Sequence, residues 1–160
     1  MIQAIALLVS LGMTPIDAQR LTIYVHAAGA LYSVDPAELL GIAWAESTLG
    51  LDRRRSHKGA CGMMGVLGSR YGSAPCWAME AFVWLAVLEG AKRLRYFTDH
   101  CGEWALPAYN GAWTNCCGGS YYRKRKADGR VWRCSTSYRA RVRAFARRVT
   151  RRKQFDTLPP

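Results

Sequence analysis

Acidic residues are scarce in this chain of 160 residues, in which 11 Asp and Glu stand against 23 Lys and Arg and leave a formal net charge of +12. The imbalance is local. Residues 1–120 contain nine acidic and nine basic side chains, whereas residues 121–160 contain 14 Lys and Arg against two Asp. Because the whole excess lies at one end of the chain, that end is predicted to contact an acidic polymer or nucleic acid.

Long apolar runs are also missing. The uncharged stretch from Met1 to Ile16 is interrupted by Gln3, Ser10, Gly12 and Pro15, and it is shorter than the ~20 residues that span a bilayer. No basic residue precedes this stretch, and no clear small-residue cleavage site follows it. The sequence therefore predicts neither a transmembrane segment nor a classical secretory signal.

Several motifs that would indicate a metal or a cofactor are absent. The six cysteines form no CxxC pair, so free thiols and disulfides of unknown connectivity stay open, and a zinc site is the least favoured alternative. No GK[ST] follows the glycines between Gly59 and Gly72, which argues against a nucleotide-binding loop. We expect no metal and no cofactor. Half of the residues are hydrophobic, which predicts a folded core.

Helix signals dominate the first half of the chain. An apolar helix is predicted over residues 2–11, and Thr14-Pro15 predicts the start of a second helix that ends near Tyr32. Asp35-Pro36 repeats this start signal for a helix that leads to Glu46. Residues 50–72 are predicted to form a long glycine-rich loop.

The second half is also predicted to be helical. Helices are expected over residues 78–97, with Trp77 and Trp84 in the core, and over residues 103–109, ending at Asn110-Gly111. A small hairpin is expected around Asp128-Gly129. A last helix is expected, with Ser135 or Ser137 as its N-cap. Its apolar residues recur at helical spacing and form one stripe, with arginines around the rest of the helix; the stripe consists of Tyr138, Val142, Phe145 and Val149. We therefore predict a mainly α fold, with one domain over residues 1–117 and a basic extension over residues 118–160.

Glu46 is the only carboxylate in the apolar stretch from Gly41 to Gly50. An ionised carboxyl on a buried face either pairs with a cation or takes up a proton, and a protonated carboxyl near neutral pH can act as a general acid. The stretch alone is equally compatible with a partly exposed glutamate at a helix end.

Four segments in order resemble the lytic transglycosylase family, of the soluble type related to goose-type lysozyme. They are Ala45-Glu46-Ser47 (the family's Glu-Ser motif), the Gly59–Val66 loop (Gly-Leu-Met-Gln-hydrophobic), Val87–Leu94 (Ile-x-x-Gly-x-x-Tyr-Leu, in part) and Trp104–Gly111 (Ala-Tyr-Asn-Ala-Gly). The match covers roughly residues 34–113. It implies a lysozyme-like helical domain. It departs from the family at Gly65, where a Gln is usual, and at Ala86, where an Asn is usual.

The resemblance implies cleavage of the β-1,4 bond between N-acetylmuramic acid and N-acetylglucosamine in peptidoglycan. Glu46 would be the acid and base, and Tyr109 would orient it. Substrate contacts would come from Ser47, Met64 and Asn110. No second acid occupies a matching motif, which fits a mechanism with one carboxylate and a 1,6-anhydro product.

Two other functions stay open: a hydrolytic muramidase on the same scaffold, and a structural virion or nucleic-acid-binding protein that has lost catalysis. The missing signal and the cationic end favour a bacteriophage enzyme, associated with the virion or delivered to the periplasm and cell wall by a holin or secretion machine. Virion or secretion-machine proteins are therefore further candidate partners.

Overall fold

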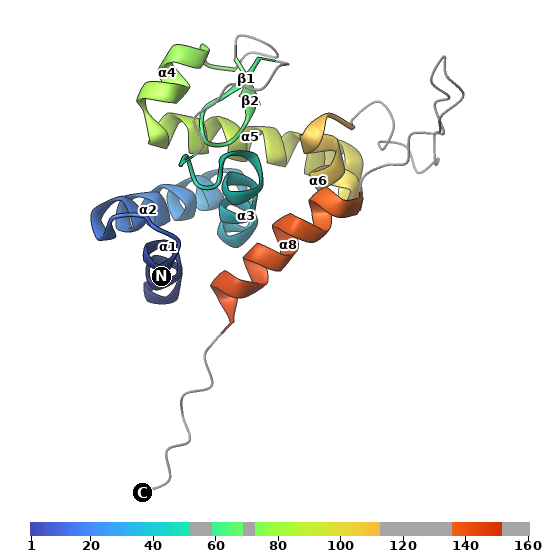
Figure 1. The fold of residues 1–160 in the computed structure, drawn as a ribbon. Coiled ribbons are helices and arrows are strands. Elements are labelled where there is room, and N and C mark those ends of the chain that lie inside the picture. The colour runs from blue at the N-terminus through green and yellow to red at the C-terminus, as the bar shows by residue number, and fades with distance from the viewer. Residues whose placement is uncertain (52–58, 69–72, 113–135, 152–160) are drawn as a thin grey trace, which may run out of the picture.

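The computed structural model describes residues 1–51, 59–68, 73–112 and 136–151. Within these ranges the chain is mainly helical, with one small hairpin (Figure 1). This agrees with the predicted fold class. The hairpin predicted around Asp128-Gly129 lies outside the described residues.

The first three helices begin where the sequence predicted. They are α1 (Ile2–Ser10), α2 (Pro15–Tyr32) and α3 (Pro36–Ser47). The Thr14 hydroxyl accepts a hydrogen bond from the Asp17 N–H at 3.1 Å, and the Asp35 carboxylate accepts one from the Ala37 N–H at 2.8 Å. Each cap satisfies a backbone donor that has no partner inside its helix.

The glycine-rich segment contains a hairpin that the sequence did not predict. Strands β1 (Ala60–Cys61) and β2 (Val66–Leu67) pair antiparallel, with Ala60 opposite Leu67 and Cys61 opposite Val66. Two-residue strands are too short to produce an alternating pattern. The hairpin instead depends on its turn and on covalent attachment to the next helix.

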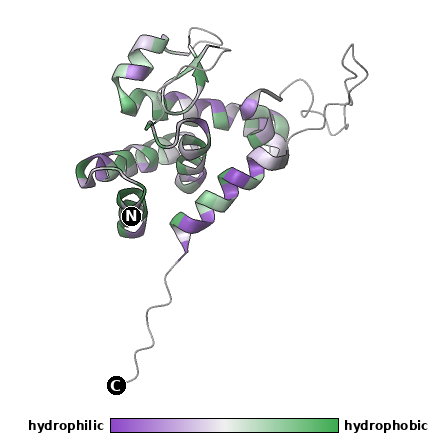
Figure 2. Cartoon of the chain, viewed as in Figure 1, coloured by the Kyte–Doolittle hydropathy of each residue, from purple (hydrophilic) through white to green (hydrophobic). Residues whose placement is uncertain are grey.

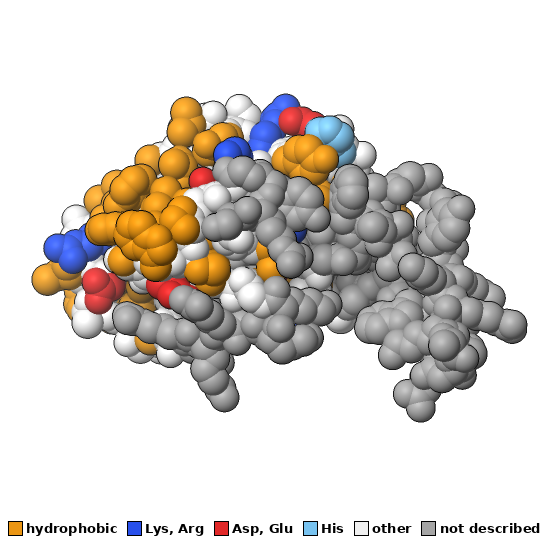
Figure 3. Space-filling view, turned by 90° about the horizontal axis from the view of Figure 1, so that it is seen from above, with side chains coloured by type: hydrophobic (Ala, Val, Ile, Leu, Met, Phe, Trp, Pro, Cys, Tyr) orange, Lys and Arg blue, Asp and Glu red, His pale blue; other side chains and the backbone are white. Residues whose placement is uncertain are grey.

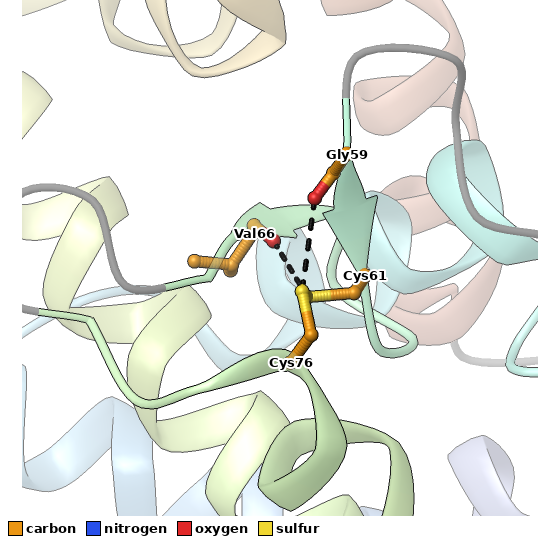
Figure 4. The surroundings of a disulfide bond; sticks show 4 residues. All are labelled: Gly59, Cys61, Val66 and Cys76. Atoms are coloured by element: carbon orange, nitrogen blue, oxygen red, sulfur yellow. Dashed lines mark hydrogen bonds between the residues drawn. A yellow bond between two sulfur atoms is a disulfide. The ribbon is translucent and has the colours of Figure 1, made fainter.

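That attachment is a disulfide between Cys61 and Cys76, whose Cα atoms lie 5.6 Å apart (Figure 4). The Cys61 sulfur lies 3.2 Å from the Val66 carbonyl oxygen, and the Cys76 sulfur lies 3.7 Å from that of Gly59. Cys101 is also disulfide-bonded. Of the alternatives that the sequence left open, free thiols or disulfides, these three cysteines form disulfides.

The helix predicted over residues 78–97 is two helices, α4 (Cys76–Ala81) and α5 (Val83–Cys101). They separate at Phe82, whose backbone is extended, with φ −121° and ψ 101°. No Gly or Pro marks this break. Trp77 and Trp84, predicted to be core residues, are 67% and 49% exposed. That prediction was wrong, because hydrophobicity alone does not say which apolar side chains find partners.

A compact series of helical turns follows α5. It consists of η1 (Gly102–Trp104), α6 (Ala105–Pro107) and the π-helical turn η2 (Ala108–Ala112). The short helix predicted over residues 103–109 is thus present in outline. It does not end at Asn110-Gly111, however, since η2 runs through both residues.

The last helix, α8 (Thr136–Thr150), packs chiefly against α3 and also contacts α1 and α6 (Figure 1). All four residues of the predicted apolar stripe are buried, and Phe145 stacks on Trp44 of α3 with ring centroids 5.3 Å apart. Gly41 permits this approach, because a Cβ at that position would lie 2.5 Å from the Val142 carbonyl oxygen. Although hydrophilic residues dominate α8 (Figure 2), one face of it belongs to the main hydrophobic core.

The proposed division at residues 117 and 118 falls outside the described residues, and so does Ser135, one of the two predicted caps. The elements on either side of that division share one core. Among the helices that the structure describes, none combines the length and the apolar character needed to cross a membrane.

We predict that Phe145→Ala destabilises the whole protein by about 3–5 kcal/mol, because it leaves a cavity between α8 and α3. Urea denaturation followed by circular dichroism measures this loss. The exposed neighbour Arg147 provides the control, since Arg147→Ala should change the free energy of unfolding by less than about 0.5 kcal/mol. An unchanged midpoint for Phe145→Ala would mean that α8 is not part of the cooperative unit.

Candidate active site

Glu46 lies in the last turn of α3 and is half-buried at the wall of a cleft of about 810 Å³. Four segments contribute residues to this cleft: 12–24, 46–51, 60–65 and 79–84. They come from the start of α2, the end of α3, the glycine-rich turn and the α4–α5 junction. The predicted acid is therefore accessible from a concave surface, as a catalytic carboxyl must be.

The glycine-rich turn lies directly against this carboxyl. Gly65 has φ +60°, and a Cβ at this position would lie 2.5 Å from Glu46 Oε2 and 2.9 Å from its Cδ. A side chain here would displace the carboxylate and would strain the backbone as well. Gly65, which departs from the resembled family, is thus the residue that lets the acid pack against the main chain.

Ser47, the residue after the acid, fixes the same turn to α3. Its buried hydroxyl donates to the Met63 carbonyl at 2.8 Å, with the Ala43 carbonyl at 3.1 Å as a second acceptor. It also accepts a hydrogen bond from the Gly50 N–H at 2.8 Å. Ser47 contributes to the cleft wall, but its hydroxyl is engaged with backbone, so its geometry favours a positioning role over the predicted substrate contact.

Tyr109, from η2, holds the same turn. Its buried hydroxyl donates to the Met64 carbonyl at 2.8 Å. Burial raises the pKa of Tyr109 well above its ordinary value, and the nearby Glu46 carboxylate adds to this rise. The hydroxyl therefore stays protonated and remains a donor. Tyr109 lies in the electrostatic neighbourhood of Glu46, although the contact that orients it is with the loop.

Two other predicted site residues lie away from the cleft surface. The Met64 side chain is fully buried against Gly90 of α5 and does not line the cleft. Asn110 is exposed in η2, and the cleft-lining residues do not include it. Met64 therefore contributes to the packing around the site, and Asn110 lies outside the described lining of the cleft.

Tyr138 lies near Glu46, although its spacing in the sequence predicted only a place in the apolar stripe of the last helix. It is almost fully buried, and its hydroxyl makes no well-formed hydrogen bond to any residue that the structure describes. It nevertheless lies near enough to Glu46 to lower the pKa of that carboxyl, while burial and Glu46 raise the pKa of Tyr138 itself. The sequence signal for this role was a tyrosine hydroxyl in a stripe that otherwise consists of Val and Phe, because a buried hydroxyl needs a polar neighbour.

The pKa of Glu46 is raised above its ordinary value, chiefly because burial disfavours the charged form. The Tyr138 hydroxyl and the positive charges of Arg141 and Arg93 act in the opposite direction without cancelling that effect. Arg93 also lies over the Tyr109 ring, with its guanidinium carbon 5.8 Å from the ring centroid. A carboxyl in this setting can donate a proton and later accept one.

Other carboxylates share the cleft. Asp17, from the first turn of α2, and Glu80, from α4, both contribute to its lining. The Asp17 carboxylate accepts a hydrogen bond from the Thr14 hydroxyl at 2.7 Å. The described part of the chain contains no group of three or more His, Cys, Asp or Glu that could hold a metal ion.

Comparison with protein-family models, with curated proteins and with solved structures produced no match for this chain.

We predict that Glu46→Gln stabilises the protein at alkaline pH. The folded-state pKa of Glu46 is raised above its unfolded value of about 4.5, so its protonated form favours folding, and this contribution is lost as the pH rises through the folded-state pKa. Thermal unfolding at pH 8 should show a higher Tm for the amide variant, and the difference should shrink toward pH 4. Equal melting curves at both pH values would contradict the buried-acid interpretation.

Proposed function

We propose that this chain is a peptidoglycan lytic transglycosylase that cleaves the bond between N-acetylmuramic acid and N-acetylglucosamine. The observation that carries the proposal is the setting of Glu46, a half-buried carboxyl with a raised pKa that opens onto a cleft. The proposed scaffold is lysozyme-like. The mainly helical fold, with the acid at the end of an apolar helix, is compatible with it.

The segments that carry the family resemblance are neighbours in space as well as in order. Ser47 and Tyr109 both donate hydrogen bonds to the glycine-rich turn, at Met63 and Met64. The α5 segment contributes Gly90, against which the Met64 side chain packs. The four motifs thus meet at one turn, which contacts Glu46 through Gly65, and this convergence supports the proposal.

In the first chemical step, the protonated Glu46 carboxyl donates its proton to the glycosidic oxygen, and the bond from that oxygen to the muramic acid C1 breaks. The carbonyl oxygen of the substrate's own N-acetyl group bonds to C1, so no enzyme nucleophile is required. Burial favours this step, because it keeps Glu46 protonated at a pH where an exposed glutamate would be ionised.

In the second step, the ionised Glu46 removes the proton from the C6 hydroxyl, and that oxygen bonds to C1 as the acetamido oxygen leaves. The product carries a 1,6-anhydro ring, and Glu46 is protonated again. Arg93, Arg141 and the Tyr138 hydroxyl all stabilise the carboxylate that exists between the two steps. The electrostatic surroundings of Glu46 thus suit both of its roles.

Hydrolysis by the same site is the second candidate. Asp17 and Glu80 line the cleft together with Glu46, and a second carboxylate is what a hydrolytic glycosidase uses to activate water or form a covalent intermediate. If one of them reaches the reacting carbon, the products carry a free reducing end in place of the anhydro ring.

We further propose that the enzyme opens the cell wall locally, as a bacteriophage protein carried in the virion or released at lysis. Two arginines of α8 face carboxylates of the body, Arg139 with Glu103 at 3.8 Å and Arg143 with Glu38 at 3.7 Å. Exposed arginines remain elsewhere on the helix, at Arg141, Arg147 and Arg148. They support contact with an acidic wall polymer or nucleic acid.

Digestion of purified sacculi with mass spectrometry of the products tests the proposed activity. We expect anhydro-muropeptides from the wild type and a loss of about 10²–10⁴-fold in rate for Glu46→Gln, because the variant cannot transfer the proton. Glu38 is the matched control: it lies on the same helix with a pKa that burial also raises, yet it does not line the cleft. Glu38→Gln should retain the activity.

Two results of this digestion would change the assignment. Products that are heavier by one water would replace the transglycosylase with a muramidase. No release by the wild type would contradict an activity on peptidoglycan and favour the structural or nucleic-acid-binding alternative.

Tyr138→Phe should move the pH profile of the reaction. Without the hydroxyl, the pKa of Glu46 rises further, so the limb where activity falls at high pH should shift to higher pH. We expect a rate loss on the order of tenfold or less, because the hydroxyl that stabilises the Glu46 carboxylate between the two steps is absent. Tyr96→Phe, at an exposed tyrosine of α5 outside the cleft, is the control. If Tyr138→Phe lowers the stability of the protein but leaves the pH profile of the reaction unchanged, Tyr138 contributes only to the core.

A further inference from the structure

Three aromatic side chains of the α4–α5 segment are exposed, and we call them the aromatic rim: Trp77 at the beginning of α4, and Phe82 and Trp84 at the α4–α5 junction. They are 67%, 47% and 49% exposed. Figure 3, viewed from above relative to Figure 1, shows hydrophobic side chains gathered on this face of the molecule. Gathered aromatic side chains at a surface indicate a binding site, since scattered exposure needs no such explanation.

Two members of the rim belong to the wall of the candidate active site. Phe82 and Trp84 line the same cleft as Glu46, and their ring centroids lie 6.3 Å apart at an interplanar angle of 42°. The break between α4 and α5 produces this arrangement, because the extended backbone of Phe82 interrupts what would otherwise be one continuous helix. Trp77 lies outside the cleft lining, at the beginning of α4.

The chemistry of the cleft matches an uncharged sugar ring better than a lipid surface. A pyranose presents C–H groups on its faces, which pack on aromatic rings, and hydroxyl groups at its edge, which need polar partners. Asp17, Arg20 and Glu80 supply such partners within the same cleft. A surface for anionic lipid would gather Lys and Arg, whereas the described residues that line this cleft include three carboxylates, Glu46 among them, and one basic side chain, Arg20.

We infer that the aromatic rim is a sugar-binding subsite, at which Phe82 and Trp84 stack on a hexosamine of a β-1,4-linked glycan whose scissile bond lies at Glu46. The inference rests on the proposed function for the identity of the glycan. It does not depend on cleavage for its test, because stacking contributes to binding before any bond breaks. The cleft volume of about 810 Å³ lies within the range of roughly 300–1,000 Å³ that is usual for ligand sites.

The test measures binding in the Glu46→Gln background, where the glycan is not consumed. The probes are a soluble β-1,4-linked N-acetylglucosamine oligomer, followed by calorimetry, and purified sacculi, followed by sedimentation. We expect Trp84→Ala and Phe82→Ala each to weaken oligomer binding by about 5–10-fold. Trp84→Phe keeps an aromatic face and should stay within about threefold of the parent.

Tyr96→Ala is the matched control, because Tyr96 is 45% exposed on the same helix as Trp84 but does not line the cleft. It should leave the affinity within about twofold. Circular dichroism checks that all variants melt like the parent. If Trp84→Ala unfolds the chain, the comparison of Trp84→Phe with Phe82→Ala still decides the question.

The outcomes separate this inference from the proposed function. Unchanged binding in both alanine variants overturns the subsite, even where wild-type protein cleaves sacculi. Weakened binding without any cleavage by the wild type supports the subsite while the proposed activity fails. Binding of phosphatidylglycerol vesicles through Trp84, with no affinity for the oligomer or sacculi, overturns the subsite and assigns the rim to a lipid surface.

Discussion

The candidate site depends on two hydrogen bonds from side-chain hydroxyls to consecutive carbonyls of one turn. Ser47 donates to Met63 from the end of α3, and Tyr109 donates to Met64 from η2. All four groups are in buried residues, so losing either donor would leave a carbonyl without its partner in a place with little access to water. These bonds hold the turn where Gly65 contacts Glu46. The position of the acid therefore depends on residues from distant parts of the chain.

The C-terminal helix contributes to the site as well as to the core. Tyr138 and Arg141, on α8, both influence the charge state of Glu46, and Trp44 and Phe145 fix this helix on α3. A segment that the sequence presents as a cationic extension thus supplies part of the environment of the acid. Its apolar stripe and its arginine-rich remainder serve different purposes on one helix.

The features that could be predicted from the sequence are those that depend on residues close together in the chain. The caps at Thr14 and Asp35 bond to backbone N–H groups two or three residues away, so their sequence context was sufficient. The stripe on α8 was equally clear, because its spacing is that of one helix face. By contrast, the break at Phe82 has no Gly or Pro to announce it. It became visible only in three dimensions.

The surroundings of Glu46 were less predictable, since they arise between distant segments. The sequence marked Glu46 and Tyr109 as partners, but it could not show that the Tyr109 hydroxyl bonds to Met64 or that Met64 itself is buried. From the sequence, Gly65 was notable only because the family usually has a Gln side chain there. In the structure, a carboxylate oxygen of Glu46 lies where a Cβ of residue 65 would be, so that only glycine fits. Trp77 and Trp84 show the opposite error, in which hydrophobic character was taken for burial.

The Cys61–Cys76 bond gives the cleft a chemical dependence on its surroundings. The bond joins residues 15 apart and encloses the turn that contacts Glu46, with the aromatic junction of α4 and α5 directly beyond it. Closing a loop of this length restricts the unfolded chain by about 3 kcal/mol in the chain-entropy model. Disulfides persist in oxidising compartments and are reduced in the cytosol of most cells. The same polypeptide would therefore hold its cleft less firmly under reducing conditions than under oxidising ones, so that thiol oxidation contributes to the stability of the cleft.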